Sequence, residues 1–169
     1  MNACSSHYLV CEGREIHYTE WGAQHSEVLI AWHGLARTRR DMDHIAAHLA
    51  GRYRIICPDT IGRGLSQWSP APEREYCLAF YERIAPALID QLGIERFHWL
   101  GTSMGGAIGL RAAAGSLRER IDRLVLNDIG PQLGPAAVAR IRGYAGSPPA
   151  FAQGACPTAA SPRITTRRW

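Results

Sequence analysis

The feature that most constrains this chain is a serine set between glycines, where an apolar segment gives way to a stretch of small residues. The sequence GTSMG fills positions 101–105, after FHWL at 97–100 and before a glycine- and alanine-rich stretch that ends at 114. This pattern predicts a strand that turns directly into a helix, with strained backbone angles at Ser103 that the flanking glycines permit. The serine hydroxyl would then stand exposed above the end of a sheet. A glycine-rich packing turn without chemistry is the alternative.

Strand-like and helix-like segments alternate through the first 128 residues, which predicts an α/β fold with a mostly parallel sheet and flanking helices. A continuous apolar run such as VLIAW at 28–32 is typical of a strand that is buried on both faces. Pro86 predicts a kink or two shorter helices within 73–92. The expected strands are 8–11 and 14–21 (an antiparallel pair), 28–32, 53–57, 97–100 and 124–126, and the expected helices are 38–51, 73–92 and 105–114.

Two loops that follow predicted strands carry further candidate residues. In the first, Gly34 would let the backbone turn sharply, so that the N–H of Leu35 could face Ser103 as an oxyanion donor. His33 is favoured as a buried histidine that shapes this loop, over a role in proton transfer. In the second, DTIGRGLS at 59–66, we expect Asp59 and Ser66 to bond to local backbone; a wall of an active-site mouth is the alternative.

The net charge of +4 belongs to the end of the chain. Fourteen arginines stand against fifteen carboxylates up to Asp128, and the remaining 41 residues hold five arginines and no carboxylate. A basic tail can bind polyanions without specificity, but no recognition motif predicts a specific nucleic-acid partner. Six of the ten prolines also lie between 131 and 162. These shifts predict a partial α/β core over 1–145, with one short helix near 136–142, and an irregular or disordered basic tail over 146–169.

The cysteines and the hydropathy pattern bear on metal binding and on the expected location of the protein in the cell. Five scattered cysteines without metal-ligand spacing predict reduced thiols and no metal site, with Cys57 and Cys77 as core residues. The first ten residues have neither the basic region nor the apolar run of a signal peptide, and no stretch approaches the roughly 20 apolar residues that span a bilayer. We therefore expect a cytoplasmic location and no membrane partner.

Taken together, the motifs resemble the α/β-hydrolase superfamily. His33-Gly34, the pattern at 59–66 and the run at 101–106 occur in the order and spacing of that family, and the resemblance covers about residues 8–145. The sequence NDIGP at 127–131 resembles the end of the strand after the nucleophile helix in esterase and enol-lactonase-like bacterial members.

The resemblance implies a function and a set of roles. It implies hydrolysis of a small-molecule ester, lactone or related carbonyl compound through an acyl-serine on Ser103, without a metal or organic cofactor. The backbone N–H groups of Leu35 and Met104 would form the oxyanion hole. The supporting loop residues would be His33, Gly34, Gly101 and Gly105.

The resemblance also exposes a missing part of the triad. In the family, the triad follows the order serine, acid, histidine along the chain, yet all seven histidines of this sequence precede Ser103. Asp128 is a candidate triad acid, or else it caps the turn before Pro131. We therefore expect a family member truncated after its nucleophile half, with the C-terminal strands missing and the tail from about Gln153 not native hydrolase sequence.

Two classes of function remain open from the sequence. One is a serine hydrolase, complete in some unexpected way or completed by another chain. The other is a non-catalytic truncated remnant that binds a partner. In either case the strand at 124–126 would form an open sheet edge, which favours self-association.

Overall fold

The computed structural model describes residues 4–132 and 134–145. The chain divides into two units, Met1–Leu133 and Gly134–Trp169. In the second unit the structure describes one helix, α5 (Pro135–Ala145), which is longer than the expected 136–142. The expected tail at 146–169 lies outside the described residues.

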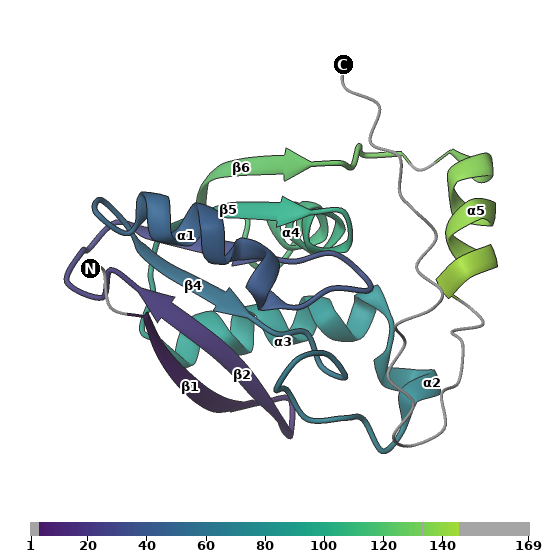
Figure 1. The fold of residues 1–169 in the computed structure, drawn as a ribbon, viewed down its shortest axis with the longest axis horizontal. Coiled ribbons are helices and arrows are strands. Elements are labelled where there is room, and N and C mark those ends of the chain that lie inside the picture. The colour runs from purple at the N-terminus through teal and green to yellow at the C-terminus, as the bar shows by residue number, and fades with distance from the viewer. Residues whose placement is uncertain (1–3, 133, 146–169) are drawn as a thin grey trace, which may run out of the picture. The chain divides into compact units, whose positions relative to one another are not determined.

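The first unit is built on a six-stranded sheet in the order β1-β2-β4-β3-β5-β6 (Figure 1). The first two neighbour pairs, β1 with β2 and β2 with β4, are antiparallel, and the others are parallel. The predicted mostly parallel α/β sheet is therefore confirmed. The strands are β1 (Cys4–Cys11), β2 (Arg14–Trp21), β3 (Val28–Trp32), β4 (Arg54–Pro58), β5 (Phe97–Thr102) and β6 (Ile121–Asn127).

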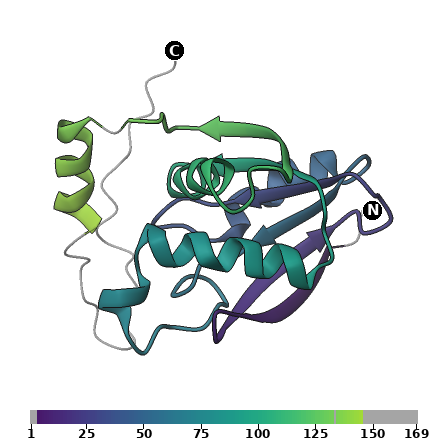
Figure 2. The same ribbon diagram turned by 180° about the vertical axis from the view of Figure 1, so that it is seen from behind.

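Helices cover both faces of this sheet, as Figures 1 and 2 show from opposite sides. One face packs against the 3-10 turn η1 (Arg39–Met42) and α1 (Asp43–Leu49). The other packs against α3 (Leu78–Gln91) and α4 (Met104–Ala114), and the short α2 (Pro72–Glu75) precedes α3. The central strand β3 contributes side chains to the apolar cores on both faces of the sheet. Val28, Ile30 and Trp32 face α3 and α4, whereas Leu29 and Ala31 face α1. This two-period alternation explains why the whole strand is apolar.

Most of the predicted local structure is confirmed, with shifts that have physical causes. The hairpin turns at Glu12 and Gly13, whose φ angles of 54° and 71° suit a two-residue loop. Thr38 caps the expected helix through its side chain, but that helix opens as η1 before α1 begins. The expected helix 73–92 divides at 76–77, not at the proline, because Pro86 is accommodated inside α3. Cys57 is buried as expected, whereas Cys77 is exposed because it lies in that break.

Gly109 gives a test of how tightly α4 packs on the sheet. A Cβ at this position would lie 2.6 Å from Trp99 Cδ1, and the Trp99 ring is held by a stack on Trp32 with centroids 5.3 Å apart. Helix propensity alone would make Gly109→Ala stabilising by about 1 kcal/mol. We expect overpacking to reverse the sign and lower the free energy of unfolding by about 1–3 kcal/mol in urea titrations.

Gly51→Ala is the matched control, because a Cβ there meets nothing within 4 Å. It should change the free energy of unfolding by no more than about 0.5 kcal/mol. A stabilising Gly109→Ala would contradict the tight contact between α4 and Trp99.

Candidate functional site

Ser103 occupies a strained turn between β5 and α4. Its backbone has φ 50° and ψ −112°, a conformation that a residue with a side chain rarely adopts. The turn is held on both sides: the Ser103 N–H donates to the Asn127 carbonyl at 2.9 Å, and the Ser103 carbonyl accepts from the Ala107 N–H at 3.0 Å. Ser103 therefore stands at the N-terminus of α4, as the sequence predicts, in a position fixed by β6 and by the helix.

The glycines around the turn are required by close backbone contacts. A Cβ on Gly105 would lie 2.6 Å from the Trp32 carbonyl carbon and 2.9 Å from the His33 carbonyl oxygen. A Cβ on Gly101 would collide with the backbone of Gly105. The first turn of α4 thus lies directly against the ends of β3 and β5. Because the contacting atoms are backbone atoms that cannot move aside, only glycine fits at these two positions.

The same contact brings the loop after β3 beside the serine. A Cβ on Gly34 would lie 3.7 Å from Ser103 Cβ, and residues 34–37 form a turn closed by the Arg37 N–H donating to the Gly34 carbonyl at 3.4 Å. Within the described residues, the backbone N–H groups of Leu35 and Met104 donate to no backbone acceptor outside the regular elements. The structure thus brings Gly34, Leu35, Ser103 and Met104 into one neighbourhood.

His33 is a fully buried residue of this loop, and both its ring nitrogens are engaged. Nε2 accepts from the Thr60 N–H at 3.0 Å, which places the ring proton on Nδ1, 2.7 Å from the Gly34 carbonyl. Burial lowers the pKa of His33 below its usual value. The ring is therefore a neutral brace between two loops, and neither nitrogen is free to act on Ser103.

The 59–66 loop is organised by Asp59, which is 1% exposed. Its carboxylate accepts from the backbone N–H groups of Arg39 and Leu65, at 2.8 and 3.1 Å, and contacts the His17 ring. Ser66 Oγ donates to the Asp59 carbonyl at 2.7 Å. This network matches the expected structural role of Asp59 and Ser66 and leaves no free group on the Asp59 side chain for a substrate.

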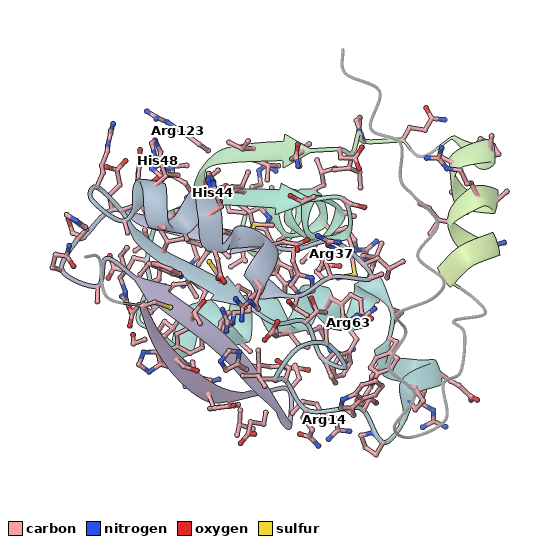
Figure 3. All side chains as sticks on the ribbon, in the orientation of Figure 1. Arg14, Arg37, His44, His48, Arg63 and Arg123 are labelled. Atoms are coloured by element: carbon pink, nitrogen blue, oxygen red, sulfur yellow. The ribbon has the colours of Figure 1, made fainter. Side chains whose placement is uncertain are left out.

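Arg63 is a residue of this region for which the sequence offered no role. Its Nε donates to the Leu35 carbonyl at 3.1 Å, and Nη1 donates to the Tyr81 hydroxyl at 2.8 Å. Figure 3 shows Arg63 and Arg37 at the end of the sheet to which the β5 arrow points. The cation packs over the rings of Tyr76 and Tyr81, with its carbon 5.3 and 5.4 Å from their centroids. Arg63 therefore holds the Leu35 carbonyl in place, and a contact between residues 28 positions apart has no local sequence signal.

Asp128 lies just past β6, one residue after the carbonyl that holds Ser103. It is exposed and has φ 54°. Among the described residues, the other histidines that form side-chain hydrogen bonds form them away from Asp128. The pairs are His7 with Ser5, His17 with Asp59 and Ser6, His25 with Gln24, and His98 with Glu27. His44 and His48 lie on α1 (Figure 3). The structure thus brings no histidine to Asp128 and Ser103.

An open depression of about 380 Å³ lies beside the edge strand β6, close to the turn at Ser103. It lies between η1 and α1 on one side and the ends of β5 and β6 on the other. The lining residues are Asp41, Met42, Ile45, Leu100, Thr102, Val125, Leu126 and Asn127. Across the described residues, no three His, Cys, Asp or Glu side chains gather to hold a metal ion, and no helix is both long and apolar enough to cross a membrane.

The fold and the turn define a hydrolase class of α/β protein, and comparison with known proteins gives the family. A family model described as alpha/beta hydrolase fold matches residues 27–165. The chain therefore belongs to the α/β-hydrolase family. A solved α/β hydrolase from Novosphingobium aromaticivorans superposes with a TM-score of 0.79 at 36% identity, over 86% of this chain and 51% of that one.

Two of the curated relatives carry the names of enzymes with different substrates. A 3-hydroxybutyrate-oligomer hydrolase from Cupriavidus necator is 45% identical over 135 residues, which is 79% of this chain and 45% of the relative. An N-formylmaleamate deformylase from Pseudomonas putida is 32% identical over 120 residues, 70% of this chain and 42% of the relative. The chain spans less than half the length of these two relatives.

The neutral state of His33 gives a pH prediction. Because its pKa is lowered on folding, the unfolded chain binds a proton more readily, and the folded state loses stability as pH falls below the unfolded value of about 6.5. Replacing His33 by Gln should remove this part of the pH dependence, while lowering stability at about pH 7.5 through imperfect pairing with Thr60.

The measurement is urea unfolding of both proteins at about pH 7.5 and about pH 5.5. The loss of unfolding free energy between the two pH values should be smaller in His33→Gln than in the parent chain. An equal loss in both would show that His33 is not a neutral brace.

Proposed function

We propose that the chain supplies the nucleophile half of a serine hydrolase that acts on an ester, lactone or similar carbonyl compound. The observation that carries this proposal is the strained backbone of Ser103 at the start of α4, beside the Gly34–Leu35 loop. Strain of this kind persists where the surrounding structure enforces it, and it presents the hydroxyl to a substrate. The broad substrate class is supported by relatives named as a 3-hydroxybutyrate-oligomer hydrolase, an N-formylmaleamate deformylase and a 2-hydroxy-6-oxononadienedioate/2-hydroxy-6-oxononatrienedioate hydrolase.

In this proposal, the Ser103 oxygen attacks the substrate carbonyl and forms an acyl-serine as the leaving group departs. The oxyanion that develops would accept hydrogen bonds from the Leu35 and Met104 N–H groups. The Met104 group lies at the positive end of the α4 dipole. His33 and Arg63 act as positioning residues, because one braces the loop from Thr60 and the other holds the Leu35 carbonyl.

The proton acceptor is the part of the proposed site that residues 1–169 do not supply. No histidine follows His98 in the 169 residues, and His33 has both nitrogens engaged. Losing a triad as a unit costs about a million-fold in turnover in a well-studied serine protease. We therefore propose that full activity requires a histidine from outside residues 1–169, with Asp128 as the candidate acid that would orient it.

Covalent labelling tests whether Ser103 is a nucleophile. The purified chain, alone and mixed with the C-terminal half of the Cupriavidus relative, is treated with a fluorophosphonate and mapped by mass spectrometry. We expect label on the tryptic peptide 97–111, increased by about 10²-fold or more in the mixture and absent in Ser103→Ala.

Ser116→Ala is the matched control, since this exposed serine lies just beyond α4 and should not affect labelling of Ser103. Label that persists on peptide 97–111 in Ser103→Ala, or none in either sample, would overturn the proposal.

A second candidate is a binding fragment that associates through β6. Within the described residues β6 pairs only with β5, and Val125 is 53% exposed on an otherwise apolar strand end. An unpaired edge of this kind is a template for another strand. In this second candidate function, the strand that pairs with β6 is β6 of a second copy of the chain.

Sedimentation velocity over a range of concentrations tests this candidate. We expect the parent chain to dimerise and Val125→Arg to weaken the dimer by about ten-fold or more, because a charge would be buried without a partner. Leu65→Arg, at a loop residue that is 56% exposed, is the control and should associate as the parent does. A parent chain that stays monomeric would exclude this candidate.

A further inference from the structure

Ser6, which is far from Ser103 in the sequence, is the first member of a series of side-chain hydrogen bonds. Ser6 Oγ on β1 is 2.7 Å from His17 Nε2 on β2, and His17 Nδ1 is 2.8 Å from Asp59 Oδ2. The three residues come from the antiparallel side of the sheet, drawn in purple in Figure 1, and from the loop after β4. None of them takes part in the proposed chemistry at Ser103.

The strand register explains why these side chains meet. Tyr8 pairs directly with His17, and Ser6 lies two residues from Tyr8, so all three side chains project from the same face. His17 is completely buried, whereas Ser6 is exposed. The only solvent-facing member of the array is therefore the serine hydroxyl.

The partners of Asp59 fix the direction of the hydrogen bonds. Its carboxylate already accepts two backbone N–H groups, from Arg39 and Leu65, and so it also accepts from His17. In the neutral form of His17 the ring proton then lies on Nδ1, and the lone pair on Nε2 faces the Ser6 hydroxyl. This is the order of groups that activates a serine: an alcohol, a neutral imidazole and a buried carboxylate that steadies the imidazolium.

We propose that Ser6 is a reactive serine, modified covalently by activated acyl and phosphonyl compounds. With a fluorophosphonate, the Ser6 Oγ–P bond forms, the P–F bond breaks, fluoride leaves and the hydroxyl proton passes to His17 Nε2. With an activated ester, the alcohol leaves instead and takes up that proton. The Tyr8 ring, with its centroid 5.0 Å from that of His17, offers an apolar wall for a small acyl or alkyl group.

The neighbouring residue provides a natural control. Ser5 Oγ is 2.7 Å from His7 Nε2, a pair on the same strand that resembles the first half of the array. The carboxylate near His7 belongs to Glu20 and lies 3.5 Å from that same Nε2, not from Nδ1. The His7 ring is also 39% exposed, so Ser5 lacks the buried acid that activates Ser6.

The experiment uses Ser103→Ala as the parent protein, so that the result does not depend on the proposed function. It is treated with a fluorophosphonate and digested with trypsin, which separates residues 1–14 from 97–111 because arginines occupy positions 14, 96 and 111. We expect one label on peptide 1–14, lowered by about ten-fold or more by adding Ser6→Ala and unchanged by adding Ser5→Ala.

Circular dichroism and urea unfolding confirm that each variant keeps the fold, which is expected because Ser5 and Ser6 are exposed. No label on peptide 1–14, or label that Ser6→Ala leaves at the same rate, would overturn the proposal. Label on peptide 97–111 of the unsubstituted chain reports separately on Ser103, so the two proposals can fail independently.

Discussion

The contact between the first turn of α4 and the end of β3 is the constraint on which the site depends. Gly105 meets the Trp32 carbonyl so closely that no side chain fits between them. The approach draws Ser103 into a positive φ and sets it beside Gly34, the residue that follows His33. This one close contact thus brings together the strained serine, the N-terminus of α4 and the loop after β3. The Trp99 indole stabilises the contact by donating to the Gly105 carbonyl at 3.0 Å.

Buried polar residues hold the loops around that contact. His33 accepts from Thr60, whose hydroxyl also accepts from the Trp32 indole at 2.8 Å, so the loops after β3 and β4 are tied to each other and to the core. Asp59 ties the second loop to η1 through the Arg39 N–H. Each polar atom in this network has a partner, as burial demands. Such a network rigidifies the site without contributing a reactive group to it.

The two edges of the sheet differ in strand direction. Among the described residues, β1 at one edge pairs only with β2, antiparallel, and β6 at the opposite edge pairs only with β5, parallel. This agrees with a chain that spans less than half the length of its curated relatives. The turn at Ser103 is nevertheless fully formed, because its contacts run to β3, β5 and β6, all of which lie within the described residues.

The element types, the turn at 101–105 and the family could all be predicted from the sequence, because the spacing of apolar residues, the placement of glycines and the turn residues are local signals. The expectation of a kink or two shorter helices in 73–92 is met by two helices, but they divide at 76–77, and Pro86 lies inside α3. Three further contacts follow from the three-dimensional packing: His33 binds Thr60, Arg63 holds the Leu35 carbonyl, and Ser6 meets a buried His17–Asp59 pair. These are contacts between residues far apart in the chain, set by strand register and loop packing, which no local pattern encodes.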